Sequence, residues 1–173
     1  MAWLAREALG ERSVAVTIVG PAVSNAEVER SKRVASAIGI RHELLAADPL
    51  RAEGYRTNPT NRCYFCRQTE TAAIRAWAAP FALRQFLDGV HADDPAEDRP
   101  GIRAMEEAGF RHPLREAGWG KRQIRALARE VGLSNWDEPS DACLASRVPH
   151  GTVLTLGLRG RIEQAEAAVR ALG

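Results

Sequence analysis

The chain has 173 residues, 45% hydrophobic and 27% charged, and this composition is typical of a folded globular protein rather than a disordered one. Its 24 basic and 22 acidic side chains leave a net charge of +2 and form no continuous basic stripe, so nucleic acid is not the expected partner. No stretch approaches the roughly 18 apolar residues of a membrane span, and the N-terminus lacks the pattern of a secretory signal. We therefore expect a cytoplasmic protein without membrane association.

The N-terminal part predicts two helices that alternate with two strands. Ser24, followed three residues later by Glu27, forms a capping box that marks the start of a helix. A β-branched run, Ser-Val-Ala-Val-Thr-Ile-Val, suits a buried parallel strand. The expected elements are a helix over Trp3–Leu9, a strand over Ser13–Val19, a helix from Ser24 to Ile38 and a strand over Arg41–Ala46.

The remainder of the chain predicts mainly helix, with one further short strand. The elements are a helix from Cys63 that ends before Pro80, a strand at Phe86-Leu87, helices over Pro100–Gly109 and Lys121–Val131, a loop over 134–152, and a helix from Leu156 to Leu172 capped by Thr155. Strands alternating with helices predict an α/β fold with a doubly wound parallel sheet, in which ligands bind beyond the carboxyl ends of the strands. We divide the chain into an α/β domain, residues 1–133, and a cysteine-bearing loop with the start of a helical region, residues 134–173.

The three cysteines are the strongest chemical signal in the sequence. Cys63 and Cys66 lie about one turn apart on one side of the predicted helix, so both can bind one metal centre. Together with Cys143 they suit an iron–sulfur cluster with one open iron, or a zinc site completed by a histidine such as His91 or His150. The alternative is that some of these cysteines only fill the core, since free cysteine is often buried.

An acidic turn follows the third predicted strand. Asp88, Asp93 and Asp94 lie where the strand ends, and carboxylate oxygens together with the phosphates of a nucleotide are the usual ligands of Mg²⁺. The turn is therefore a candidate nucleotide and magnesium site. A solvated, capped loop is the alternative.

Four further residues suggest anion binding. Ser146 and Arg147 can form a clamp for a phosphate or a carboxylate, because arginine binds such groups through two parallel hydrogen bonds. Arg62 and Arg67 flank the first thiols and can attract an anionic substrate. In each case the alternative is a surface charge.

Three stretches taken together resemble one enzyme family. They are Asn-Pro-Thr-Asn-Arg-Cys-Tyr-Phe-Cys at 58–66, Asp-Gly-Val-His-Ala-Asp-Asp at 88–94 and Pro-Ser-Asp-Ala-Cys-Leu-Ala-Ser-Arg-Val-Pro-His-Gly at 139–151. The resemblance is to the ATP-dependent sulfur transferases that build the nickel-pincer cofactor of lactate racemase (the LarE family), within the PP-loop ATP pyrophosphatase superfamily. It covers nearly the whole chain, in order, and implies the adenine nucleotide alpha-hydrolase-like, Rossmann-type fold.

The resemblance implies an enzyme that adenylylates a carboxylate with ATP and Mg²⁺, releases pyrophosphate and installs sulfur to give a thiocarboxylate. The substrate in that family is a pyridinium dicarboxylate mononucleotide. Members that carry only the cysteine matching Cys143 sacrifice its sulfur, whereas members with the extra C-x-x-C resemble enzymes that hold a 4Fe-4S cluster. Since all three cysteines are present here, the resemblance favours the cluster variant.

The same resemblance assigns roles to individual residues. Cys63, Cys66 and Cys143 would be cluster ligands, with Cys143 also a catalytic residue. The nucleotide, its metal ion and the substrate would be held by Asp88, Asp93, Ser146 and Arg147.

One feature of the superfamily has no counterpart in these residues. Its first strand ends in a Ser-Gly-Gly-x-Asp-Ser loop that binds the phosphates of ATP, and the present sequence begins within the helix that should follow it. We therefore expect a gap at the centre of the sheet and weak ATP binding. The alternatives are a non-catalytic cluster- or zinc-binding module and a tRNA-thiolating PP-loop enzyme, although the small net charge disfavours the latter. Assembly of the chain into a homo-oligomer is compatible with this sequence.

Overall fold

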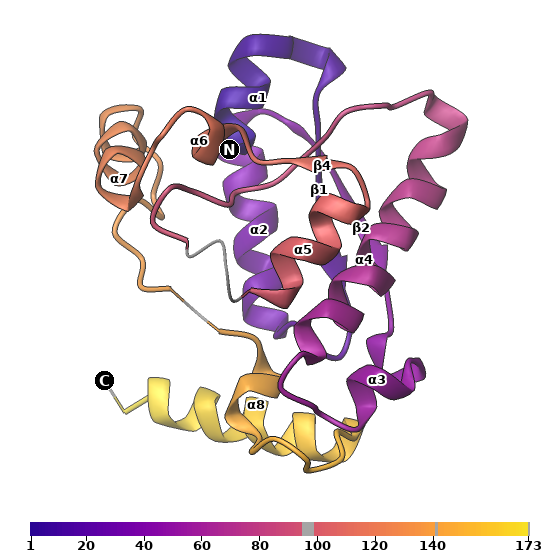
Figure 1. The fold of residues 1–173 in the computed structure, drawn as a ribbon. Helices are drawn as coiled ribbons and strands as arrows, with labels where there is room; N and C mark the ends of the chain where they lie inside the picture. Colours follow the sequence, from indigo (N-terminus) through magenta and orange to yellow (C-terminus); the bar gives the residue numbers. More distant parts are fainter. Residues whose placement is uncertain (95–98, 141, 173) are drawn as a thin grey trace.

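The computed structural model describes residues 1–94, 99–140 and 142–172, and they form an α/β fold as predicted (Figure 1). Its strands are β1 (Val14–Val19), β2 (Arg41–Ala46), β3 (Phe86–Leu87) and β4 (Phe110–Arg111). The helices are α1 (Ala2–Leu9), α2 (Asn25–Ile38), α3 (Glu53–Arg56), α4 (Arg62–Ala78), α5 (Pro100–Glu107), α6 (Pro113–Glu116), α7 (Lys121–Glu130) and α8 (Leu156–Arg170). Short 3₁₀ turns occupy residues 10–12, 49–51, 79–81 and 144–147. None of the helices in the described residues is long and apolar enough to cross a membrane.

The four strands form two separate parallel pairs. β1 pairs with β2 in a register that joins Val14 to Arg41 and Val19 to Ala46, and β3 pairs with β4 over two residues. Every residue of β1 is only half-buried, although its sequence, VAVTIV, suits a fully buried strand. A cavity of about 600 Å³ lies beside β1 and is also lined by Leu87 of β3. Parallel strands are thus confirmed, whereas the single doubly wound sheet remains a prediction.

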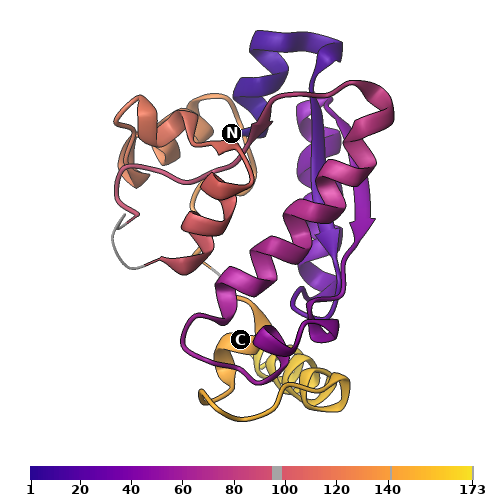
Figure 2. The same cartoon turned by 45° about the vertical axis from the view of Figure 1, so that its right-hand side comes forward.

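Helices cover both faces of the β1–β2 pair. Figure 2 shows α2 on one face and α4 crossing the other, and α4 packs in turn against α5. The bounds of the first two strands agree with the prediction to within one residue. β4 was not predicted, because a strand of two residues gives no periodic pattern.

Local signals in the sequence define the helix ends well. At the start of α2, the Ser24 hydroxyl accepts a hydrogen bond from the Glu27 amide at 3.2 Å, and the Glu27 carboxylate accepts one from the Ser24 amide at 3.1 Å. Gly39 ends the same helix with φ 72°. Thr155 caps α8 by accepting a hydrogen bond from the Leu158 amide at 3.2 Å. The predicted caps are therefore confirmed.

A small core joins the C-terminal segment to the first half of the chain. The buried members of this cluster come from both regions and are Ala22, Tyr55, Ala145, Val148 and Leu154, with Leu158 and Ile162 of α8 packed against them. The loop after residue 141 thus packs against Tyr55 of α3, and the Leu154 amide donates to the carbonyl of Arg56 at the end of that helix at 2.9 Å (Figure 1). The division into domains at residue 133 remains a prediction.

The capping box supports a first prediction about stability. Ser24→Ala removes the hydroxyl that accepts from the Glu27 amide, so it should lower the free energy of unfolding by about 1 kcal/mol in urea titrations. Ser36→Ala, at an exposed position of the same helix, is the matched control and should change stability little. Equal losses in the two variants would contradict the role of the cap.

Candidate functional site

One buried side chain ties the two cysteine-bearing segments together. Asn58 is completely buried, and its backbone has φ 55°, a left-handed conformation that asparagine tolerates better than most residues. Its Nδ2 donates to the carbonyl of Pro149 at 2.8 Å, and its Oδ1 accepts from Nη1 of Arg62 at 3.0 Å. The Gly151 amide donates to the carbonyl of Asn58 at 2.9 Å. These bonds hold the start of α4 against the loop that follows Cys143.

The three thiols gather around the buried Tyr55 side chain. Cys66 and Cys143 are half-buried against the cluster that contains Tyr55, whereas Cys63 is exposed, and all three are free. Burial, first, and then the neighbouring cysteines raise the pKa of the Tyr55 phenol. The structure therefore brings together the segments that carry the three predicted metal ligands.

The donor chemistry fits an iron–sulfur cluster, because three thiolates leave one iron open. In the part of the chain that the structure describes, no group of three His, Cys, Asp or Glu side chains is placed to hold a metal ion. The thiols are thus neighbours around Tyr55 rather than a closed ligand set. The role of Cys63, Cys66 and Cys143 as metal ligands remains a prediction.

Cys66 is held in its protonated form by a neighbour that the sequence analysis missed. Its Sγ donates a hydrogen bond at 3.3 Å to Oε1 of Glu70, one turn further along α4. Glu70 is buried, and its other oxygen accepts from Nη1 of Arg67 at 2.6 Å. Burial and the Glu70 carboxylate raise the pKa of the Cys66 thiol. Binding of a metal by Cys66 would therefore have to displace a proton.

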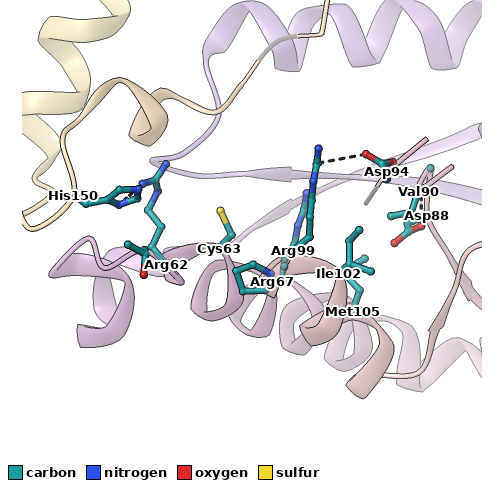
Figure 3. A pocket seen from close by; sticks show the side chains of 14 residues that line it. Arg62, Cys63, Arg67, Asp88, Val90, Asp94, Arg99, Ile102, Met105 and His150 are labelled. Atoms are coloured by element: carbon teal, nitrogen blue, oxygen red, sulfur yellow. Dashed lines mark hydrogen bonds and ion pairs between the residues drawn. The ribbon is translucent and has the colours of Figure 1, made fainter. Parts of the chain in front are cut away.

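Cys63 is the thiol that opens onto a large cavity of about 720 Å³. The cavity lies between the start of α4, the start of α5, the acidic turn and the loop that carries His150 (Figure 3). Three arginines, two aspartates and a histidine provide its charged and titratable side chains: Arg62, Arg67, Arg99, Asp88, Asp94 and His150. The cavity is thus suited to a polar, anionic ligand larger than a single ion.

The predicted acidic turn contributes two carboxylates to this cavity. Oδ1 of Asp88 accepts hydrogen bonds from the Val90 amide at 3.0 Å and from Nδ1 of the buried His112 at 2.7 Å. Asp94 forms an ion pair with Arg99 at 3.4 Å. Both carboxylates line the cavity and are held in place by these partners.

Asp93 has a structural role in this arrangement. Its Oδ2 accepts a hydrogen bond from the Lys121 amide at 2.6 Å, at the first residue of α7. A carboxylate at a helix N-terminus stabilises the helix by satisfying a free amide and by its interaction with the helix dipole. Asp93 is not among the residues that line the cavity, so its predicted contact with a nucleotide is not built into this geometry.

The predicted anion clamp also lies outside the cavity. The Ser146 hydroxyl donates to the carbonyl of Cys143 at 2.7 Å. Arg147 forms an ion pair with Glu166 of α8 and donates to the carbonyl of Ala142 at 2.9 Å. These contacts stabilise the cysteine-bearing loop, and the structure does not bring Ser146 and Arg147 together with Asp88.

Comparison with known proteins places the chain near one characterised enzyme. No established family profile matches the chain. An uncharacterised protein of Synechocystis sp. is 37% identical over 173 residues, which is 100% of this chain and 65% of that protein. The pyridinium-3,5-bisthiocarboxylic acid mononucleotide synthase of Lactiplantibacillus plantarum is 29% identical over 171 residues, 98% of this chain and 62% of the synthase. An uncharacterised protein of Methanocaldococcus jannaschii is 28% identical over 113 residues.

Nearly all of the chain, 98% of its residues, aligns with that synthase. It spans less than two thirds of the length of each of these relatives. The similarity supports the resemblance drawn from the sequence motifs, and it covers the segments that carry all three cysteines.

Asn58 supports a second prediction. Asn58→Ala removes buried hydrogen bonds to Arg62 and to the loop after Cys143, and should lower the free energy of unfolding by about 3 kcal/mol in urea titrations. Asn61→Ala is the control, because Asn61 is exposed and its side chain caps no helix. If the two variants unfold at the same urea concentration, Asn58 does not hold the two segments together.

Glu70 supports a third prediction, about thiol reactivity. Glu70→Gln removes the negative charge that raises the pKa of Cys66, so the thiolate fraction and the rate of Cys66 alkylation by iodoacetamide at pH 8 should both rise, by about tenfold for one pKa unit. Mass spectrometry of digested protein would give the rate at each cysteine. Glu29→Gln, on the exposed face of α2, is the control and should leave the rate unchanged. An unchanged rate in Glu70→Gln would show that burial alone protects Cys66.

Proposed function

We propose that this chain is part of an ATP-dependent sulfur transferase that converts a carboxylate of a pyridinium mononucleotide into a thiocarboxylate. The observation that carries the proposal is the similarity, over 98% of the chain, to a synthase whose name states such a product. Further support comes from the geometry of the site. Three cysteines lie around one tyrosine, and the most exposed of them opens onto a cavity with arginines and aspartates in its wall.

The chemistry requires activation of the carboxylate before sulfur can enter. A carboxylate is a poor electrophile, and transfer of AMP from ATP gives an acyl adenylate and pyrophosphate. A sulfur nucleophile then forms a bond to the acyl carbon, and the bond to the AMP oxygen breaks. Arginines in the cavity wall suit the anionic substrate, and Asp88 and Asp94, which line the same cavity, would supply oxygen ligands for Mg²⁺.

Within this proposal the three thiols have unequal tasks. Cys63, Cys66 and Cys143 would hold a 4Fe-4S cluster, which when bound supplies sulfide for the transfer. Cys63 reaches the cavity directly. Cys66 would transfer its proton before it binds iron, and Glu70 is the group placed to accept that proton. Cys143 comes from the loop held by Asn58. In the sacrificial alternative Cys143 would itself donate the sulfur.

A fourth prediction tests the proposal. Protein prepared without oxygen should contain iron and acid-labile sulfide in near-equal amounts, with visible absorption, and Cys63→Ala should lose both. Ser146→Ala is the control, since its hydroxyl donates to the carbonyl of Cys143, accepts from Nη1 of Arg147 and supplies no sulfur ligand. Release of AMP and pyrophosphate from ATP would be measured on the same samples with a pyridine carboxylate present.

The outcomes of this experiment separate the alternatives. A cluster together with pyrophosphate release would support the enzyme. Metal without pyrophosphate release would favour a metal-binding module. Absence of iron, combined with a mass loss equal to H₂S at Cys143 after turnover, would overturn the cluster and favour a sacrificial cysteine.

A further inference from the structure

Arg62 is a buried guanidinium without an acidic partner. Only 7% of the residue is exposed, yet it lines the cavity at Cys63. Its Nη1 donates to Oδ1 of Asn58 at 3.0 Å and lies 3.2 Å from Nδ1 of His150. In the described part of the chain it forms no ion pair. Burial of an unpaired charge is costly, so proteins keep a buried cation of this kind where an anionic ligand supplies the missing charge.

The other arginines of the cavity do not share this feature. Arg67 is paired with the buried Glu70 at 2.6 Å, and Arg99 is paired with Asp94 at 3.4 Å. Figure 3 shows Arg62 beside His150 at one end of the cavity, with Asp88 and Asp94 at the opposite end. Among the described residues that line the cavity, Arg62 is therefore the one arginine without an ion pair, and it lies away from the carboxylates.

The unpartnered donor of Arg62 belongs to the edge of the guanidinium that suits an oxyanion. With Nη1 occupied, the Nε–Nη2 edge remains, and this edge binds a carboxylate or a phosphate through two parallel hydrogen bonds. Nε is shielded from solvent and has no hydrogen-bond partner in the described residues. If Nδ1 of His150 accepts from Arg62, the proton of the imidazole is on Nε2, and this exposed ring can donate a further hydrogen bond.

We propose that Arg62 and His150 form an oxyanion-binding subsite that holds a carboxylate or phosphate group of the ligand beside Cys63. This assignment rests on the proposed function only for the identity of the ligand. It places anion binding at the start of α4, whereas the predicted clamp of Ser146 and Arg147 bonds to the protein's own loop and to α8. Because Arg62 and the exposed Cys63 both line this cavity, a group bound by Arg62 shares the cavity with an accessible sulfur.

The experiment uses alkylation of Cys63 to report occupancy of the subsite. The whole chain is treated with iodoacetamide at constant ionic strength, in chloride alone, with inorganic phosphate or with pyridine-3-carboxylate, and the rate at each cysteine is read by mass spectrometry. We expect one of the two anions to protect Cys63 in a saturable manner while the rate at Cys143 stays constant. The anion that protects identifies the group, phosphate or carboxylate, that the subsite binds.

Two variants locate the effect. Arg62→Gln keeps an amide donor for Asn58 but loses the positive charge and the paired N–H donors of the guanidinium. It should therefore weaken the affinity of the protecting anion by about tenfold or more. Arg84→Gln removes the same charge at an exposed position outside the cavity and should leave protection unchanged. His150→Ala, at an exposed position, should weaken protection by about threefold. If thermal unfolding shows that Arg62→Gln is not folded, the comparison of wild type with His150→Ala replaces it as the test.

Two results would overturn the subsite: no saturable protection of Cys63 by either anion, or equal affinity in wild type and in the folded Arg62 variant. If the Arg62 variant is unfolded, an affinity of His150→Ala for the anion equal to that of wild type would overturn the subsite. Iron, sulfide and ATP take no part in the measurement. Its failure would therefore leave the sulfur transferase proposal intact, and failure of that proposal would leave phosphate binding at Arg62 unaffected.

Discussion

The site depends on the hydrogen bonds of one buried asparagine. Asn58 precedes the helix that carries Cys63 and Cys66, and it bonds to carbonyls 90 and 91 residues further along the chain. Since a buried amide must be satisfied, the loop after Cys143 can pack only where its carbonyls meet that amide. The same side chain accepts a hydrogen bond from Arg62, which fixes the guanidinium at the cavity wall. One residue thus sets the relation between the thiols, the core at Tyr55 and the anion-binding end of the cavity.

Charge is distributed unevenly over the cavity. Asp88 is held by the buried His112 and Asp94 by Arg99, so both carboxylates of the cavity have a cationic or hydrogen-bonding partner before any ligand arrives, and Arg67 is likewise paired with Glu70 outside it. Such pairing fixes side-chain positions in advance and lowers the entropy lost when a ligand binds. Among the described residues, Arg62 is the one arginine of the cavity without an acidic partner, since its contacts are with Asn58 and His150. A ligand with an anionic group at one end and a metal-bound phosphate at the other would match both ends.

The sequence was informative where a structural signal is local. The capping box of Ser24 and the cap at Thr155 depend on residues three positions apart, and both are present as predicted. Glu70 could have been found from its i, i+4 spacing to Cys66 on a predicted helix. Other contacts have no local signal. Asp93 accepts a hydrogen bond from an amide 28 residues away, and Asn58 donates one to a carbonyl 91 residues away. Residue type predicted that Asp93 and Arg147 bind ligands, but the packing of α7 and α8 supplied partners from the protein itself.

The three thiols differ in environment, and this difference bears on the order of events in the proposed reaction. Cys66 is half-buried, and its thiol donates a hydrogen bond to Glu70, so any step that needs its thiolate must first move a proton onto a neighbour. Cys63 is exposed and lines the same cavity as Arg62, which has no acidic partner among the described residues. A substrate group bound at Arg62 would therefore reach the sulfur end of the cavity without any rearrangement of Cys66. Since Arg62 and Cys63 both belong to the first turn of α4 and line the same cavity, the proposed reaction would place recognition of the anion and delivery of sulfur on one rigid element.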